Sequence, residues 1–381
     1  LETSTMPGWA ASSWYFLRYM DPHNDKTFAA KKAMDYWGQV DLYVGGSEHA
    51  TGHLLYARFW GHFLKDRQHI PFAEPFKHLV NQGMIQGVSG FVHREEGSNI
   101  YLSQALAQGR KTQKIHVDIR LLDKHDALDL DGFRAWLPDL ADAVFEPANG
   151  PIIVEREVEK MSKSKVNVVN PDPIIDEHGA DALRLFEMFL GPLEQSKPWD
   201  TQGLAGVTGF LRKVMRLMDR VETLEGSKQE QRVLHVLMDK VERDIASLSL
   251  NTSVSAMMIA VNQWLDMPQL SKASMKDFAI ILSPFAPHVA EEIWQLLGGK
   301  ASITLEPYPQ LNKALLVQDE ITYPVQFNGK TRFMLTVAAA TDKAAIEALV
   351  MADERSAKHL AGKTVRKIIV VPKRIVNVVL S

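Results

Sequence analysis

The sequence has no cysteine among its 381 residues. This excludes disulfide bonds and thiolate metal ligands, and it is compatible with a reducing compartment without demonstrating one. Long hydrophobic runs are also absent, because no segment reaches the ~18 uninterrupted apolar residues of a membrane helix. No basic segment followed by an apolar one marks a secretory leader. We therefore expect no membrane partner.

Excess charge of either sign is small as well. The 43 Lys and Arg residues nearly balance the 46 Asp and Glu residues, which gives a net charge of -3. Any basic surface for an anionic partner must therefore be local. The composition is 46% hydrophobic and 23% charged, as in soluble globular proteins, and the length suits two or three domains. Because the sequence opens at Leu1 and not at methionine, we expect it to be a piece of a longer chain.

Residues 1–85 show a mixed α/β pattern. The run VDLYVGG (40–46) is typical of a buried strand that ends in two glycines, and FKHLVNQGMI (76–85) predicts a second strand. Between them, SEHATGHLLYARFWGHFLKD predicts a helix with Ser47 as its N-cap. Four apolar side chains share one broad face of that helix: Leu54, Leu55, Phe59 and Phe63. Strand, helix and strand together predict a parallel arrangement whose ligands lie where the strands end.

The character of the sequence changes after residue 85. Short apolar blocks in GSNIYLS, KIHVDIRLL and GPIIVEREV predict strands, with one short helix near LDGFRAWL. Residues 86–155 are therefore interpreted as a small inserted α+β module. Residues 156–200 form a further region, in which DPIIDEHG and ADALRLFEMFLG predict helices that end at Gly179 and Gly191.

Residues 201–315 predict a helical bundle. Four apolar stripes recur at helical spacing: Phe210, Val214, Leu217 and Val221; Val233, Leu237, Val241 and Ile245; Val254, Met257, Val261 and Leu265; and Ile281, Phe285, Val289 and Ile293. Pro284 and Pro287 are expected to break or kink the last of these helices.

Residues 316–381 predict a small α+β domain. Asn328-Gly329 between two strand-like runs is a strong hairpin signal. A helix of about twenty residues is expected next, and then strands on either side of Pro372. From 321 to 381 there are ten Lys and Arg residues against four Asp and Glu residues. No acid follows Glu354, whereas Lys358, Lys363, Arg366, Lys367, Lys373 and Arg374 do. Such clustering fits either a nucleic-acid backbone or an ordinary solvated face.

The stretch EREVEKMSKSKVNVVNPDP (155–173) concentrates lysines and hydroxyls. Lys160 and Lys163 lie beside Ser162 and Ser164, and prolines close the segment. A lysine is a compact point charge on a flexible stem, which suits a phosphate whose geometry changes during a reaction. The alternative is a solvated basic loop.

Two further stretches hold candidate site residues. His49 and His53 are four positions apart and share one helical face, as in helical zinc hydrolases. Those enzymes place a glutamate directly after the first histidine, whereas Glu48 precedes it here, and no third ligand is evident. We therefore predict no structural metal. The stretch MPGWAASSWYFLRYMDP (6–22) places two hydroxyls among aromatic rings, which also fits a helix packed into a core.

Taken together, these motifs give the sequence a family resemblance. KMSKS (160–164) is the signature of class I aminoacyl-tRNA synthetases. The blocks VGGSEHATGHLLYARFW (44–60) and MPGWAASSWYFLRYMDP (6–22), in this order before it, resemble the leucyl-tRNA synthetases of bacteria. NPDPIIDEHGADALRLFEMFLGP, QSKPWD and LSPFAPHVAEEIW also match that family, so the resemblance covers most of the chain and is weakest over 86–155.

The resemblance implies a fold and site residues. The fold would be an α/β Rossmann-like catalytic half with a small inserted α+β module, followed by an α-helical bundle and a small α+β carboxyl-terminal domain. Lys163 would stabilise charge on the leaving pyrophosphate, with Lys160 in support. The leucine pocket would be walled by Trp9, which stands where the family has phenylalanine, and by Ser12, Tyr15 and His49. The residues towards ATP and the adenylate would be Gly45, Gly46, Glu48, His53, Gln82 and Met84, of which Met84 also fits a core position.

The implied activity is the ATP-dependent joining of leucine to tRNA(Leu) in the cytoplasm, with Mg²⁺ accompanying the ATP. The residues that would contact the tRNA are Lys358, Lys363, Arg366, Lys367, Lys373 and Arg374. The family's amino-terminal ATP motif and its editing domain are not in these 381 residues, so we expect the chain to need the amino-terminal half of the enzyme and to be inactive alone. The alternative is a non-catalytic tRNA-binding module derived from a class I synthetase.

Overall fold

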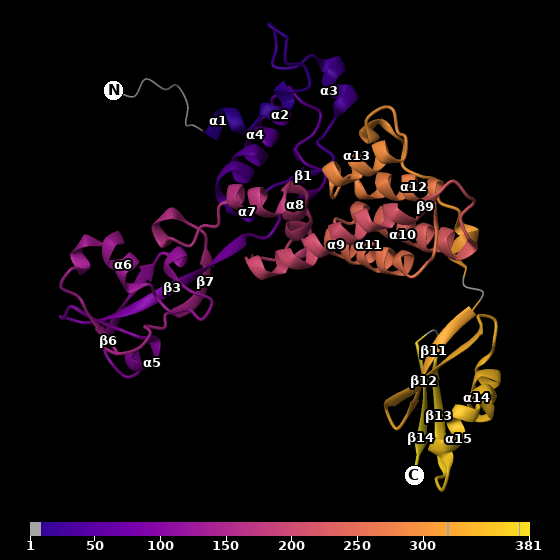
Figure 1. The fold of residues 1–381 in the computed structure, drawn as a ribbon. Helices are drawn as coiled ribbons and strands as arrows, with labels where there is room; N and C mark the ends of the chain where they lie inside the picture. The colour runs from indigo at the N-terminus through magenta and orange to yellow at the C-terminus, as the bar shows by residue number, and fades with distance from the viewer. Residues whose placement is uncertain (1–8, 318–319, 373) are drawn as a thin grey trace.

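The structure is a computed structural model that describes residues 9–317, 320–372 and 374–381. It combines helices and strands, and Figure 1 shows them as successive units along the chain. Within the described residues, buried apolar side chains gather in four separate clusters, and each cluster draws on one continuous part of the sequence. Four of the five predicted regions have a cluster of their own, whereas residues 156–200 do not, because Ile174, Leu185 and Phe186 belong to the cluster of the helical bundle.

The first unit contains a short parallel sheet. Its elements are α1 (Trp9–Ser12), α2 (Tyr15–Arg18), α3 (Lys31–Trp37), β1 (Tyr43–Val44), η1 (Ser47–His49), η2 (Ala50–Leu54), α4 (Leu55–Asp66) and β2 (Leu79–Val80). β1 and β2 pair in parallel, with Tyr43 opposite Leu79. The predicted strand–helix–strand order is thus confirmed, although both strands are two residues long. The Rossmann-like assignment of this part stays a prediction, because the sheet has two strands.

The helix of this unit differs from its prediction in two ways. Ser47 does not cap α4, because residues 47–54 form one 3₁₀ turn and one π-helical segment before the regular helix begins. The predicted apolar face is also exposed: Leu55, Phe59 and Phe63 are 58%, 66% and 49% accessible. The buried residues of this helix are Ala57, Gly61 and Leu64. A Cβ on Gly61 would lie 2.5 Å from the carbonyl oxygen of Ala73, so only glycine permits this close approach.

The second unit is built on the long strand β3. Its elements are β3 (Ile85–Glu95), β4 (Ile100–Leu102), α5 (Gln104–Ala107), β5 (Thr112–Val117), η3 (Ile119–Leu121), α6 (Leu130–Trp136), η4 (Pro138–Leu140), β6 (Val144–Glu146), β7 (Glu155–Lys160), η5 (Lys163–Lys165) and β8 (Lys197–Pro198). The strand order is β5-β3-β4-β6, and β7 and β8 also pair with β3. The predicted strands and the short helix α6 are present.

The predicted boundary between residues 86–155 and 156–200 falls inside this sheet. β7 crosses it and pairs with β3 from Gln86 to Phe91, and β8 adds a parallel pair at Ile85. A break after Glu155 would separate hydrogen-bonded neighbours. The stem of the lysine-rich stretch is therefore part of the inserted sheet.

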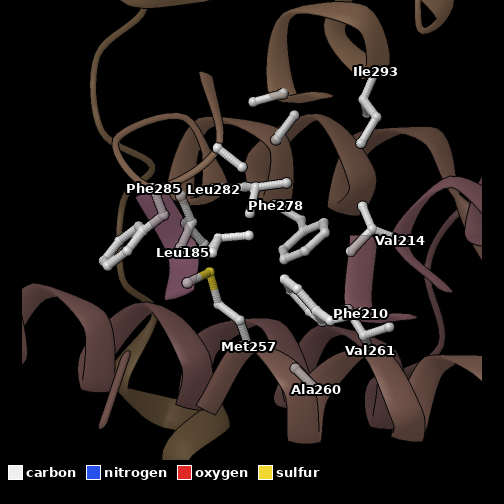
Figure 2. Close-up of a cluster of buried hydrophobic side chains, with 14 of the residues drawn as sticks. Leu185, Phe210, Val214, Met257, Ala260, Val261, Phe278, Leu282, Phe285 and Ile293 are labelled. Carbon is white, nitrogen blue, oxygen red and sulfur yellow. The ribbon is translucent and has the colours of Figure 1, made fainter. Parts of the chain in front are cut away.

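The third unit is a bundle of helices. Its elements are α7 (Pro171–His178), α8 (Ala180–Phe189), η6 (Thr201–Gly203), α9 (Leu204–Leu217), η7 (Met218–Arg220), β9 (Val221–Glu222), α10 (Lys228–Ala246), α11 (Leu250–Leu265), β10 (Leu270–Ser271), α12 (Lys272–Leu282), α13 (Pro287–Leu296), η8 (Ile303–Leu305) and η9 (Lys313–Leu316). Figure 2 shows Leu185 of α8, Phe210 of α9, Met257 of α11, Phe278 of α12 and Ile293 of α13 in one core.

Most of the predicted stripes are buried in this core. The helix is interrupted between α12 and α13, as was expected from Pro284 and Pro287. The second stripe is shifted around α10, because Leu234 and Met238 are buried while Val233 is half-buried and Ile245 is exposed. The stripe of α10 was therefore placed about one residue off.

The last unit is a four-stranded sheet with two helices. Its elements are β11 (Glu320–Phe327), β12 (Lys330–Ala338), α14 (Lys343–Ala352), α15 (Glu354–Leu360), β13 (Val365–Val371) and β14 (Ile375–Leu380), and the strand order is β12-β11-β14-β13. The helices lie on one side of the sheet (Figure 1). The hairpin at Asn328-Gly329 is confirmed, with φ of 49° and 81° at its two turn residues. The single helix predicted there is wrong, because Asp353 ends α14 and caps α15.

Candidate functional site

A cavity of about 480 Å³ opens at the carboxyl end of β1. Eight residues predicted for leucine or adenylate binding line it: Trp9, Ser12, Gly45, Gly46, Glu48, His49, His53 and Gln82. They come from three separate stretches of sequence, so the fold brings them together. Four further lining residues were not predicted: Tyr43, Val44, Leu54 and Leu79. The signal for Tyr43 was present, because it lies on a strand directly before the two glycines.

The irregular turns after β1 position the two histidines. A 3₁₀ turn holds His49 and a π-helical segment holds His53, so both side chains reach the cavity although the backbone is not a regular α-helix. π-helical turns are rare and are often found at functional sites. Gly46 faces the carboxylate of Glu48, and the place of a Cβ there lies 2.0 Å from a carboxylate oxygen. Glycine at position 46 therefore leaves room for Glu48.

Three side chains form a hydrogen-bonded chain beside the cavity. The hydroxyls of Tyr15 and Tyr43 are 2.9 Å apart, and the Tyr43 hydroxyl is 2.6 Å from Nε2 of His53. The Tyr43 ring stacks on Phe76 at 3.8 Å between centroids. Burial and the neighbouring Tyr15 raise the pKa of Tyr43, so it stays a neutral phenol. Tyr15 does not line the cavity itself and acts on it through Tyr43.

The surroundings of His53 favour its neutral form. Burial, and secondly the nearby His49, lower the pKa of His53. Its Nε2 is engaged by Tyr43, while its buried Nδ1 has no partner among the described residues. No group of three or more His, Asp or Glu side chains in the described ranges could hold a metal ion. The spacing of His49 and His53 is therefore not accompanied by a further ligand in that part of the chain.

Other buried polar atoms near the cavity also lack partners. Oε1 of Gln82 and Oδ1 of its neighbour Asn81 accept no hydrogen bond from the described residues. Buried polar atoms usually have partners, so unpaired acceptors beside a cavity indicate unused capacity for a ligand. Trp9 closes one side of the site, with its ring 3.4 Å from the position of a Cβ on Gly52, and it is 45% exposed.

The lysine-rich stretch lies apart from this cavity. Lys163 lines a different cavity of about 680 Å³ beside η3 and α7, together with Asp118, Arg120 and Glu177. Lys160 ends β7 and is exposed. The backbone of Met84 bonds to Ser196 and Lys197 near β8, and Met84 is not among the lining residues. The structure thus places Lys160, Lys163 and Met84 apart from the eight predicted residues that line the cavity.

The basic residues near the carboxyl end are exposed. Lys358, Lys363, Arg366, Lys367 and Arg374 form no salt bridge with an acid in the described ranges, and Lys373 lies outside them. Burial lowers the pKa of His359, and the charges of Arg332, Lys358 and Lys363 lower it further. Arg332 of β12, which was not predicted, therefore joins this positive cluster.

Two family models match parts of the chain. The model of class I tRNA synthetases for I, L, M and V matches residues 148–198, and the model of the anticodon-binding domain of tRNA ligases matches residues 231–348. The first contains the lysine-rich stretch, and the second runs from α10 into α14.

Two leucine–tRNA ligases match this chain along its whole length. The chain is 50% identical over 384 residues to the leucine–tRNA ligase of Christiangramia forsetii and 51% identical over 387 residues to that of Flavobacterium psychrophilum. Each match covers 100% of this chain and 40% of the relative. The chain matches the leucine–tRNA ligases along its entire length. The resemblance to this family is thereby confirmed, and the matched region is the carboxyl-terminal part.

A solved structure of a LeuRS complex also matches the chain. A crystal structure of the ternary complex of Agrobacterium radiobacter K84 agnB2 LeuRS, tRNA and LeuAMS matches with a TM-score of 0.64 and 26% identity. This match covers 100% of the chain and 43% of the other. The chain thus spans about two fifths of the length of the leucine–tRNA ligases it matches. Within the described residues, no helix is both long and apolar enough to cross a bilayer.

Proposed function

We propose that the chain is the carboxyl-terminal part of a bacterial-type leucine–tRNA ligase that acts in the cytoplasm. The enzyme would join leucine and ATP into leucyl-adenylate with release of pyrophosphate, and then transfer the leucyl group to the terminal ribose of tRNA(Leu). One observation carries this proposal: eight residues assigned by resemblance to leucine or adenylate line one cavity, although they come from three stretches of sequence.

The leucine side of the cavity is assigned to Trp9, Ser12 and His49, with Tyr15 acting through Tyr43. Tryptophan and the aliphatic Leu54 and Leu79 offer an apolar wall for a branched side chain. Such a wall separates aliphatic amino acids by only ~1–3 kcal/mol per methylene, which is why this kind of enzyme also edits its products.

The adenylate side is assigned to Gly45, Gly46, Glu48, His53 and Gln82. The two glycines leave the backbone open to close approach by a nucleotide. The unpaired oxygen of Gln82 suits a nitrogen–hydrogen donor on the adenine ring, and the unpaired Nδ1 of His53 adds a second polar contact. Met84 remains a candidate for the adenine and lies directly before β3 of the inserted sheet.

The lysine-rich stretch is assigned to the leaving group. Lys163, supported by Lys160, would neutralise negative charge on pyrophosphate as the bond between the α- and β-phosphates of ATP breaks. ATP would arrive with Mg²⁺ as its substrate complex, and no resident metal is proposed. Because Lys163 lines a different cavity here, this role requires the stretch to move towards the nucleotide.

The tRNA backbone is assigned to Arg332 and to the six basic residues Lys358, Lys363, Arg366, Lys367, Lys373 and Arg374. Unpaired and exposed cations release counterions when they meet phosphates, and this favours binding without requiring a particular base sequence. Lys358 and Lys363 are close enough to His359 to lower its pKa, so these two members of the cluster lie near each other around His359.

The exposed apolar face of α4 supports a need for the amino-terminal half. Leu55, Phe59 and Phe63 present adjacent apolar side chains to solvent, an arrangement that marks interaction sites in folded proteins. Packing of the amino-terminal half on this face would complete the ATP site beside the cavity. We therefore propose that the chain alone does not activate leucine.

Pyrophosphate exchange tests this proposal. The chain alone is expected to give no leucine-dependent exchange between ATP and pyrophosphate, whereas mixing it with the amino-terminal half of the enzyme restores exchange. Exchange by the chain alone would contradict the need for a second part. A folded mixture that binds tRNA and never supports exchange would favour the alternative, a non-catalytic tRNA-binding module. The separation of Lys163 from the cavity is the observation that favours this alternative.

A further inference from the structure

Glu159 lies at the centre of a polar network below the lysine-rich stretch. Its carboxylate is 2.6 Å from Nζ of Lys165, 2.6 Å from the hydroxyl of Ser89 and 2.9 Å from Nε2 of His116. The hydrogen bonds from Lys165 and Ser89 lower the pKa of Glu159 to about 2, so it is a carboxylate at neutral pH. Three strands meet here, because Ser89 is on β3, His116 on β5 and Glu159 on β7.

Asn167 holds the other side of the same stretch. Its side-chain oxygen accepts from the backbone N–H of Ser162 at 3.0 Å, and its amide donates to the hydroxyl of Ser89 at 2.9 Å and to the carbonyl of Lys160 at 3.4 Å. Asn167 and Ser89 are fully buried. Glu159 and Asn167 therefore hold the stretch at residues 160, 162 and 165, and both side chains are hydrogen-bonded to Ser89.

The backbone around Asn167 is fitted to this arrangement. A Cβ on Gly87 of β3 would lie 2.5 Å from the carbonyl oxygen of Asn167, so glycine is needed for the stretch to lie this close. Val166 has a φ of +46°, a left-handed conformation that is unfavourable for a β-branched residue. Strained residues persist only where their surroundings hold them, and the clamped neighbours on both sides supply that restraint.

We propose that Glu159, Asn167 and Ser89 form a clamp that holds residues 160–166 in the position where Lys163 lines the cavity beside η3 and α7. These three are positioning residues, because none of them lines the cavity at the end of β1. The clamp couples the inserted sheet to the lysine-rich stretch, and its release is required before Lys163 can approach the nucleotide. This last step rests on the proposed function, whereas the clamp itself does not.

Hydrogen–deuterium exchange of the chain tests the clamp directly. The amides of Ser162, Lys165 and Val166 are hydrogen-bonded and report on it. In Glu159→Gln, loss of the carboxylate charge weakens the tie to Lys165, and these amides are expected to exchange about tenfold faster or more. Gly87→Ala, which changes no polar group, is expected to act in the same direction by displacing Asn167.

A matched control is available on the same strand. Glu157 also pairs with a lysine, Lys114, but makes no contact with the stretch; Glu157→Gln is therefore expected to leave the three amides unchanged. In a double-mutant cycle, Glu159→Gln and Lys165→Gln together are expected to exchange no faster than the faster single variant. Unchanged exchange in α10 and α11 shows that the fold is intact. Equal rates in Glu159→Gln and the parent protein would overturn the proposal, as would equal acceleration by Glu157→Gln.

The link to catalysis is measured separately in the mixture with the amino-terminal half. Because Glu159→Gln frees the stretch and Lys163 acts mainly on the transition state, kcat/KM for ATP is expected to rise by about threefold, with the KM for leucine unchanged. General damage to the fold would not improve the use of ATP. A lower kcat/KM for ATP would contradict the claim that the clamp opposes the approach of Lys163. If the parent mixture gives no pyrophosphate exchange at all, the proposed function fails, and the amide exchange still decides the clamp.

Discussion

Replacement of Lys163 by alanine is expected to lower leucine-dependent pyrophosphate exchange by about 10²–10³-fold in the mixture of this chain with the amino-terminal half, the range seen when one charge-stabilising donor is removed. Negative charge spreads over the phosphate oxygens as the pyrophosphate leaves, and an ammonium group that meets it there acts on the transition state more than on bound ATP. The loss is therefore expected in kcat, while the KM for leucine stays close to that of the parent.

The control for this experiment is Lys124→Ala, which removes an exposed lysine from the inserted unit and leaves residues 160–166 intact. It is expected to retain full exchange. Lys160→Ala is expected to cause a smaller loss than Lys163→Ala, because its role is support. Undiminished pyrophosphate exchange in Lys163→Ala would contradict the assignment of Lys163 to the leaving pyrophosphate.

Replacement of Trp264 by alanine is expected to destabilise the helical bundle by about 3–5 kcal/mol, the usual cost of deleting a large buried aromatic side chain. Trp264 of α11 is fully buried, and its ring meets that of Phe278 of α12 edge to face at 5.0 Å between centroids. Alanine would leave a cavity between two helices that are both fixed by other contacts in the same core. Urea denaturation followed by far-ultraviolet circular dichroism measures the loss.

Two variants make this result specific. Trp264→Phe keeps an aromatic ring and removes an indole N–H that has no partner in the described structure, so it is expected to cost less than half as much. Trp37→Ala removes an exposed tryptophan and is expected to change the free energy of unfolding by about 0.5 kcal/mol or less. A Trp264→Ala protein as stable as the parent would mean that the bundle is packed differently.

The sequence predicted the elements whose signals are local. Asn328-Gly329 specified its hairpin because only a turn with two positive φ values joins those strands tightly. The prolines at 284 and 287 separated α12 from α13 because proline cannot continue a helix. Eight of the predicted site residues, from three stretches, also gathered in one cavity, although that expectation came from a family resemblance and not from spacing.

The remaining differences arise from contacts that a local pattern does not contain. Helical spacing assigned one apolar face to α4, but it could not show that the small residues Ala57 and Gly61 face the protein. The π-helical turn at 50–54 has no periodic signal. Pairing between β3 and β7 joins segments about 70 residues apart. Composition therefore could not show that the boundary predicted after Glu155 falls inside a sheet. Arg332 was missed because it lies before the basic cluster in sequence and beside it only in the fold.

Formation of leucyl-tRNA tests the central claim most directly. The chain and the amino-terminal half together, with ATP, Mg²⁺ and labelled leucine, are expected to attach label to tRNA(Leu), and neither part is expected to do so alone. Valine and isoleucine at the same concentration should be attached far less. A mixture of folded parts that binds tRNA(Leu) tightly and leaves it uncharged would contradict the assignment of the cavity to leucyl-adenylate.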